Sequence, residues 1–169
     1  MTTLYLVRHG ETEDNVAQIM QGQTQGRLTA RGVEQARGLA DALADERLDA
    51  IVASDLKRAV DTAKVVADIR GMELELTPLL RERDWGGFTG RFIPDLKDAP
   101  WPDDIETLEQ MTERAAAFLD YIKTKHHDQR VLAVGHGIIN KAVQAVFRNL
   151  PMNRIPRMDN AEVRVLEIP

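Results

Sequence analysis

The sequence predicts an α/β fold of three layers, in which a mostly parallel central sheet carries helices on both faces. Short apolar runs typical of buried strands alternate with longer amphipathic segments typical of helices. No internal repeat or low-complexity linker interrupts the 169 residues. Strands that alternate with helices favour right-handed crossovers between parallel strands. We therefore expect a single domain over residues 1–169, which is long enough to bury a substantial core.

The expected elements of the first half follow directly from this pattern. Residues 4–7 are apolar and predict a short buried strand, and residues 49–53 predict a second one. Thr29 is a candidate N-cap for the helix between them, because its hydroxyl can accept from the first free amides. Apolar residues at helical spacing over residues 56–67 predict a second helix, which Gly71 ends.

The rest of the chain contains one irregular region and five further elements. Glycines and prolines are frequent in residues 81–104, and this composition predicts a loop region with little regular structure. The other expected elements are a short strand at residues 74–76 stopped by Pro78, a long amphipathic helix at 105–122, a strand at 130–134, a helix at 138–146 and a final strand at 163–168.

Composition excludes several classes of protein. The formal net charge of -5 disfavours nucleic acids and anionic membranes as partners, because no local basic patch offsets it. The chain has no cysteine, which removes disulfides, cysteine-based zinc sites and thiolate nucleophiles and suits a cytoplasmic location. The apolar run that ends at Arg8 is too short for a signal peptide, and no stretch approaches the length of a membrane span.

Chemistry-bearing residues stand where three of the expected strands end. Arg8 and His9 follow the first strand, Arg58 follows the second, and His136 follows the strand at 130–134. The carboxyl ends of parallel strands lie along one edge of a sheet, and ligands bind in the crevice outside them. Two arginines and two histidines gathered there would form a cationic cluster that fits an anion such as a phosphate group.

Four motifs in this order resemble the histidine phosphatase superfamily, the phosphoglycerate-mutase-like proteins. They are Leu-Val-Arg-His-Gly-Glu-Thr at 6–12, Ser-Asp-Leu-Lys-Arg-Ala at 54–59, Leu-Arg-Glu at 80–82 ahead of Trp-Gly at 85–86, and Val-Gly-His-Gly at 134–137. The likeness covers nearly the whole chain. It implies the phosphoglycerate-mutase-like form of the three-layer fold, and an enzyme that acts on phosphate esters.

The resemblance also implies roles for individual residues. His9 would be the nucleophile that carries the phosphoryl group, since a neutral imidazole is a competent nucleophile at neutral pH. Arg8 and Arg58 would bind the phosphate oxygens, and His136 would donate to the transferring group. Glu82 would protonate the leaving oxygen and then activate water.

Other assignments rest on weaker signals. Asp84 and Glu11 are near in sequence and compete with Glu82 for the acid–base role. Asn15, Gln21 and Gly22 match positions that line the phosphate pocket in relatives, although the segment at 21–24 also fits a plain surface turn.

Further residues bear on the substrate and on metal binding. Arg83 and Thr89 stand where relatives often have an apolar and an acidic residue, which leaves the fit of the substrate open. Four aromatic residues fall in or near the loop region and form either an apolar wall beside the pocket or part of the core: Trp85, Phe88, Phe92 and Trp101. His126 and His127 are adjacent and would diverge on a helix, so we expect them at a helix C-terminus and no metal site.

These observations favour a metal-independent phosphomonoester phosphatase, of the histidine acid phosphatase type, that needs no cofactor and acts on a small phosphorylated substrate. Mutases of the superfamily carry a longer insertion over the site, whereas here a shortened lid at about 91–104 would admit water. The alternatives are a cofactor-dependent phosphoglycerate mutase and a non-catalytic phospho-ligand sensor on the same fold. The oligomeric state is open, with a homodimer as one alternative.

Overall fold

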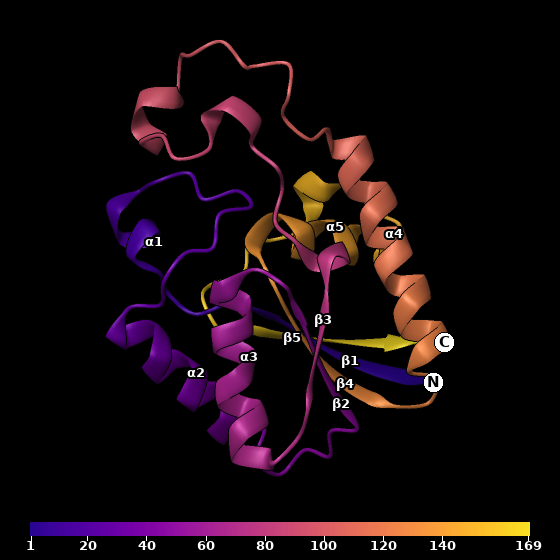
Figure 1. Ribbon diagram of the computed structural model, residues 1–169. Helices are drawn as coiled ribbons and strands as arrows, with labels where there is room; N and C mark the ends of the chain where they lie inside the picture. Colours follow the sequence, from indigo (N-terminus) through magenta and orange to yellow (C-terminus); the bar gives the residue numbers. More distant parts are fainter.

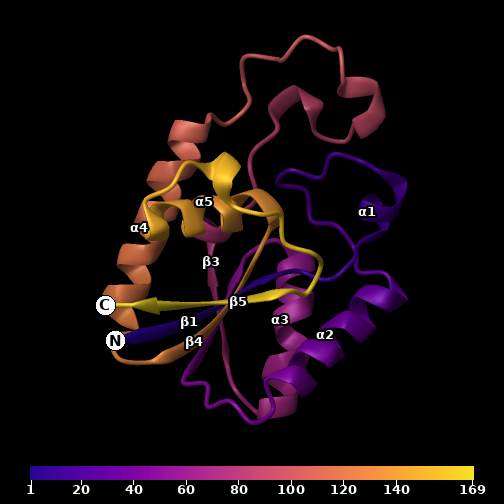
Figure 2. The same cartoon turned by 180° about the vertical axis from the view of Figure 1, so that it is seen from behind.

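A five-stranded sheet lies between two layers of helices in the computed structural model, which describes residues 1–169 (Figures 1 and 2). The strands are β1 (Thr2–Arg8), β2 (Ala50–Ser54), β3 (Leu74–Thr77), β4 (Arg130–Gly135) and β5 (Val163–Ile168). The helices are α1 (Glu13–Ala17), α2 (Ala30–Ala42), α3 (Lys57–Arg70), α4 (Leu108–Lys125) and α5 (Gly137–Arg148). Short 3-10 turns are η1 (Pro78–Leu80), η2 (Gly86–Phe88), η3 (Ile93–Leu96) and η4 (Met152–Arg154).

The sheet is mostly parallel, so the predicted fold class is confirmed. Its strand order is β3-β2-β4-β1-β5, and only β5 runs antiparallel to its neighbour. The central strands are covered on both faces, and residues 131–134 of β4 are entirely buried. Burial alternates along the second half of β5, as expected for an edge strand with one face toward solvent.

Two hydrophobic cores lie on opposite faces of this sheet. Side chains of α4 and α5 pack with β1 and β4 in one core, whose largest buried member is Phe118. Alanines and leucines of α2 and α3 pack with β2 and β4 in the other. Figures 1 and 2 show the two helix pairs on either side of the strands. Each fully buried leucine or valine contributes about 1.5–3 kcal/mol, so these layers hold the strand ends in place.

The expected long helix begins three residues later than its apolar pattern indicated. Thr107 caps α4 through a capping box, with its hydroxyl accepting from Gln110 N. Ile105 therefore lies outside the helix, where it packs with Phe88 in a small satellite cluster. Leu108, expected on the apolar side, is half exposed. The capping residues decided this boundary, because they satisfy amides that an earlier start would leave free.

The segment between η1 and α4 carries little regular structure, as expected, and contains η2 and η3. It lies beside the loop around α1, in both views, at the end of the molecule where the parallel strands finish (Figures 1 and 2). Backbone hydrogen bonds join the two loops, for example from Met20 N to Arg91 O at 2.9 Å. None of the helices combines the length and apolar composition needed to cross a membrane.

The topology brings the motif-bearing strand ends together. β4 lies between β1 and β2, and Arg8 pairs in register with Gly135 while Ala53 pairs with Val134. The residues that follow these strands therefore emerge side by side. Gly10 permits a close approach here, since a Cβ on it would lie 2.6 Å from Gly32 O at the start of α2.

Candidate active site

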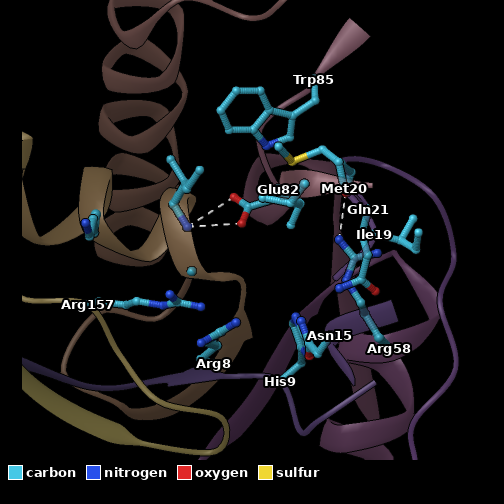
Figure 3. Close-up of a pocket in the computed structure, with 15 residues that line it drawn as sticks. Arg8, His9, Asn15, Ile19, Met20, Gln21, Arg58, Glu82, Trp85 and Arg157 are labelled. Atoms are coloured by element: carbon cyan, nitrogen blue, oxygen red, sulfur yellow. Dashed lines mark hydrogen bonds between the residues drawn. The ribbon is translucent and has the colours of Figure 1, made fainter. Parts of the chain in front are cut away.

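A cavity of about 310 Å³ opens at this edge of the sheet (Figure 3). Its lining brings together residues from β1, α1, α3, α5 and four connecting segments that are distant in sequence. Among the residues that the sequence proposed for the site, the cavity is lined by Arg8, His9, Asn15, Gln21, Gly22, Arg58 and Glu82. His136 is fully buried next to His9, with their ring centroids 5.1 Å apart. All eight residues thus lie in or against one cavity.

One nitrogen of His9 is free to act as a nucleophile. Its Nδ1 lies 2.7 Å from the carbonyl oxygen of Gly10. A carbonyl only accepts, so Nδ1 carries the proton and Nε2 keeps its lone pair. The backbone of this turn is fixed by Thr62, whose hydroxyl accepts from Gly10 N at 3.0 Å, and by Asn160, which donates to His9 O at 3.0 Å.

The surroundings of His9 keep its imidazole neutral. Burial lowers the pKa of His9, and the nearby charges of Arg58 and Arg8 lower it further, to about 3 from the usual 6.5. The bond to Gly10 O opposes this change but does not offset it. At neutral pH the lone pair on Nε2 is therefore present in essentially every molecule.

His136 caps α5 and faces the same region. Its Nε2 lies 2.9 Å from Ser54 Oγ at the end of β2, so a hydrogen bond joins the motif at the end of β2 to the motif at the end of β4. Burial lowers the pKa of His136 well below its usual value, and the charges of Arg58 and His9 act in the same direction. Its Nδ1 is buried without a hydrogen-bond partner.

Two buried guanidinium groups flank the histidines. Arg58, 1% exposed, donates to the carbonyl oxygens of Thr24 and Gly22, the latter at 2.6 Å. Burial lowers the pKa of Arg58 to about 10, so it remains charged at neutral pH. Arg8 donates to Met158 O at 2.8 Å, and burial followed by the neighbouring charge of Arg157 lowers its pKa.

Three nitrogen atoms of this cluster are buried without a partner. They are Nε of Arg8, Nε of Arg58 and Nδ1 of His136. Proteins rarely leave buried polar groups unpaired, because each one loses its hydrogen bonds to water and gains none in the protein, at a cost of about 1–3 kcal/mol. An anion with several oxygens is a chemical partner for such a set.

Glu82 is the carboxylate that lies in the cavity. Its oxygens accept from the backbone amides of Ile138 and Ile139 in the first turn of α5, at 3.0–3.2 Å, and from Arg83 N at 2.9 Å (Figure 3). The two competitors lie elsewhere. Asp84 accepts from Gly86 N outside this cavity, and Glu11 accepts from the hydroxyl of Thr29.

The backbone around Glu82 is clamped by a side chain that the sequence analysis did not single out. Arg114 of α4 donates to the carbonyls of Leu79 and Arg81, and its charge pairs with Glu106 through two bonds of 2.8 and 3.0 Å. Arg114 and Glu106 line a separate cavity and not this one, and they lie more than twenty residues from Glu82 in the sequence, so the motif around residue 82 gives no signal for them.

Asn15, Gln21 and Gly22 line the cavity and also shape its loop. Asn15 completes the cap of α1 and its Oδ1 accepts from Thr12 N at 3.0 Å. Gln21 is buried and accepts from the Thr12 hydroxyl, so the segment at 21–24 is more than a surface turn. Gly22 adopts a positive φ of 52°, and its carbonyl is held by Arg58.

Two further cations line the cavity that motif reading missed. Lys141 lies one turn into α5, and Arg157 lies in the loop between η4 and β5. The start of α5 at the cavity edge was a usable signal for Lys141, because residues four apart in a helix lie on the same face and Gly137 lines the cavity. Arg157 has no such signal, since its position depends on how the loop before β5 folds back.

The aromatic residues divide between the cavity, the core and the surface. Trp85 lines the cavity, whereas Phe88 is buried in the satellite cluster. Phe92 and Trp101 are 42% and 59% exposed and do not line it. The guanidinium carbon of Arg83 lies 4.6 Å from the ring centroid of Trp85, outside the cavity, so this departure from the family pattern does not touch the site directly.

The remaining histidines lie at the far end of α4, as predicted. His126 is the C-cap and is buried, with bonds of 2.7 Å to Gln129 and 2.8 Å to Glu75, while His127 is exposed. No group of three or more histidine, aspartate or glutamate side chains is arranged to hold a metal ion.

Comparison with known proteins identifies relatives over most of the chain. Residues 4–169 match the family model described as the histidine phosphatase superfamily, branch 1. A protein of Enterobacter sp. named a probable phosphoglycerate mutase is 35% identical, over 89% of this chain and 77% of its own. A metal-independent phosphoserine phosphatase of Arabidopsis thaliana is 32% identical, over 99% and 77%.

Solved structures agree with this assignment. A mycobacterial glucosyl-3-phosphoglycerate phosphatase in complex with a vanadium oxide shares 28% identity, with a TM-score of 0.91 over 98% of this chain and 92% of that one. The four motifs, the strand order and the family match agree, so the chain belongs to the histidine phosphatase superfamily.

Proposed function

We propose that this protein is a metal-independent phosphomonoester phosphatase that works through a phosphohistidine on His9. One observation carries the proposal. A neutral imidazole with a free Nε2 lies among three buried side-chain nitrogens without partners, in a cavity that also contains one carboxylate. This set matches the needs of phosphoryl transfer, which are a nucleophile, fixed positive charge around the phosphoryl oxygens, and a proton donor for the leaving group.

The proposed reaction has two steps. In the first, the lone pair of His9 Nε2 forms a bond to phosphorus, the ester P–O bond breaks, and protonated Glu82 gives its proton to the leaving alkoxide. In the second, Glu82 takes a proton from water, the resulting hydroxide bonds to phosphorus, and the P–N bond breaks. Inorganic phosphate and free His9 are the products. Arg8, Arg58 and His136 would stabilise the charge on the phosphoryl oxygens in both steps.

Metal independence is part of the proposal. The guanidinium groups of Arg8 and Arg58 are preorganised by bonds to backbone carbonyls, and they carry the positive charge that a metal supplies in other phosphatases. Activity should therefore persist in excess chelator.

Hydrolysis is favoured over mutase activity by the loop next to the cavity. Residues 91–104 contain only η3 as a regular turn, and Phe92 and Ile93 are 42% and 43% exposed. We propose that this shortened lid lets water reach the phosphohistidine. The relative named a phosphoglycerate mutase supports the second candidate, a cofactor-dependent mutase, in which phosphoryl return would outpace hydrolysis.

The substrate is proposed to be small. A cavity of about 310 Å³ is at the lower end of the range for small-molecule sites. The names of relatives point the same way, since they include phosphatases of phosphoserine and of glucosyl-3-phosphoglycerate. A cytoplasmic location, consistent with the cysteine-free sequence, completes the proposal.

A panel of phosphate esters tests the proposal. Purified protein in excess chelator should release inorganic phosphate from an aryl phosphate and from several alkyl phosphates, and His9→Gln should abolish the release. Phosphoglycerate isomerisation, stimulated by the bisphosphate and faster than phosphate release, would favour the mutase. Undiminished turnover in His9→Gln would refute the mechanism, and no turnover of any ester would favour a phospho-ligand sensor.

A further inference from the structure

A buried serine contacts the second histidine of the site, and the reaction proposed above gives this serine no part. Ser54 is the last residue of β2 and is entirely buried, as is His136. Oγ of Ser54 lies 2.9 Å from Nε2 of His136. On the same imidazole, Nδ1 is buried without a hydrogen-bond partner. The effect of Ser54 on His136 therefore depends on which ring nitrogen carries the hydrogen.

The imidazole of His136 carries only one hydrogen on its nitrogens at neutral pH. Burial lowers the pKa of His136 well below its usual value, and the nearby charges of Arg58 and His9 act in the same direction. In a neutral imidazole one ring nitrogen carries a hydrogen and donates, while the other carries a lone pair and accepts. Two tautomers are thus available to His136, and the groups around the ring decide between them.

The hydroxyl of Ser54 already accepts one hydrogen bond. Leu56 N lies 3.2 Å from Oγ, and a backbone amide can only donate. A hydroxyl has two acceptor positions and one hydrogen, so Oγ keeps one acceptor position and its own hydrogen for a second partner. That partner is Nε2 of His136, because Ser54 Oγ forms hydrogen bonds with these two groups alone.

The two tautomers of His136 differ in what they leave unpaired. If Nε2 carried the hydrogen and donated to Ser54, the serine hydrogen would be buried without an acceptor, and Nδ1 would be a buried lone pair without a donor. If Ser54 donates to Nε2, the serine hydrogen is paired, and only the N–H at Nδ1 stays unpaired. Each buried unpaired group destabilises the folded protein, so the second arrangement is favoured.

The group that stays unpaired in the second arrangement suits an anion. His136 lies against His9, with ring centroids 5.1 Å apart, and Nε of Arg8 and Nε of Arg58 are likewise buried without partners. The oxygens of a phosphoryl group accept hydrogen bonds, so an N–H at Nδ1 attracts them, whereas a lone pair at Nδ1 would repel them.

We propose that Ser54 is a positioning residue, which holds His136 in the tautomer with hydrogen on Nδ1 so that a neutral imidazole donates to the transferring phosphoryl group. The inference rests on the function proposed above and assigns Ser54 a part in it. Ser54 acts through Nε2 of His136 and does not touch the substrate itself. The fold places it for this part, because β2 and β4 are neighbours and Ala53 pairs in register with Val134.

The tautomer is measured in the protein without substrate. Nitrogen-15 NMR of the imidazole rings distinguishes a nitrogen that carries hydrogen from one that carries a lone pair. The chain has four histidines, and the signals missing from His136→Gln identify those of His136. At neutral pH we expect hydrogen on Nδ1 and a lone pair on Nε2. Ser54→Ala should raise the share of the other tautomer, because nothing then donates to Nε2.

Activity shows whether the tautomer matters to the reaction. Ser54→Ala should lower kcat for an aryl phosphate by about tenfold, the size expected when one hydrogen bond to the reacting group is lost. Thr77→Val is the matched control, because Thr77 pairs in register with Ser54, is buried and accepts from Leu79 N at 3.2 Å, but forms no hydrogen bond with a histidine. It should leave the tautomer of His136 and kcat unchanged.

Three results would overturn the inference. They are hydrogen on Nε2 of His136 in the native protein, a Ser54→Ala protein with the native tautomer, and a Ser54→Ala protein with the other tautomer but native kcat. If Ser54→Ala does not fold, Ser54→Cys keeps a weak donor and should change the tautomer and kcat in the same direction. Failure of the phosphatase proposal is recognised separately, by absence of His9-dependent turnover in the protein with all its native residues.

Discussion

Gly137→Ala should separate stability from activity in this protein. Gly137 is the first residue of α5 and lines the cavity between two proposed functional groups. A Cβ at this position would lie 3.6 Å from Arg8 Nε and 3.8 Å from Glu82 Oε2, which is ordinary van der Waals contact. The folded protein therefore accepts the methyl group without strain, but the methyl group occupies space that the proposed mechanism gives to the transferring phosphoryl group.

The two expected effects have opposite signs. Replacing a helical glycine by alanine reduces the freedom of the unfolded chain, which should raise the free energy of unfolding by about 0.4–1 kcal/mol. For a chain of this size that corresponds to a rise in Tm of about 1–4 °C. The methyl group would displace the phosphoryl group by on the order of 1 Å, which lowers kcat/KM by about 100-fold.

Thermal unfolding followed by circular dichroism and hydrolysis of an aryl phosphate measure these two effects. Gly38→Ala is the control, because Gly38 lies within α2 and a Cβ there would meet nothing within 4 Å. It should raise Tm similarly and leave kcat/KM unchanged. Full activity in Gly137→Ala would refute the placement of the phosphoryl group between Arg8 and Glu82, as would an activity loss that merely follows a lower Tm.

Three further predictions concern stability. Burial and then the charge of Arg58 lower the pKa of His9 to about 3, so between pH 6.5 and 3 only the unfolded chain binds a proton at this residue. The free energy of unfolding should therefore fall as the pH is lowered through this range. Urea unfolding at pH 7 and pH 4.5 measures the fall, which should be smaller in His9→Gln. Burial alone would raise the pKa of Glu75, but hydrogen bonds from Lys125, Tyr121 and His126 outweigh it and lower the pKa to about 2. Its stabilising contribution is therefore present above about pH 4.5 and lost toward pH 2, so Glu75→Gln should flatten the acid limb of a stability profile; an unchanged limb would contradict the assignment. Thr62→Val should lower the free energy of unfolding by about 1–3 kcal/mol because it leaves Gly10 N–H buried and unpaired, whereas Thr62→Ser should restore most of it; equal stabilities in urea would disprove the role of this bond.

Much of the fold follows from periodicity and from residues at strand ends. Continuous apolar runs identified β1 and β4, and helical spacing identified α2, α3 and α5, because these elements bury one face or both against the rest. The start of α4 was placed too early, since apolar spacing extends through Ile105 while the Thr107 cap decides where the amides are satisfied. Neither α1 nor the 3-10 turns follow from periodicity, because they are one turn long and depend on local caps.

Some residues of the site could likewise be placed from the sequence, and others could not. Residues directly after a parallel strand could be placed from sequence, since register alone brings Arg8 and His136 to the same edge. The partner of His9 Nδ1 could not, because the carbonyl of Gly10 accepts only in the turn conformation that Thr62 and Asn160 stabilise. Arg157 depends on a loop that returns across the sheet edge, and no pattern in one sequence encodes that path.

Rapid quenching during turnover shows whether His9 carries the phosphoryl group. The protein is mixed with an excess of a phosphate ester, quenched in alkali, digested and examined by mass spectrometry. We expect a single phosphoryl group on His9, which is lost on exposure to acid and is absent from His9→Gln. Steady release of inorganic phosphate with no phosphoryl group on His9 at any time, or with one on another side chain, would contradict it.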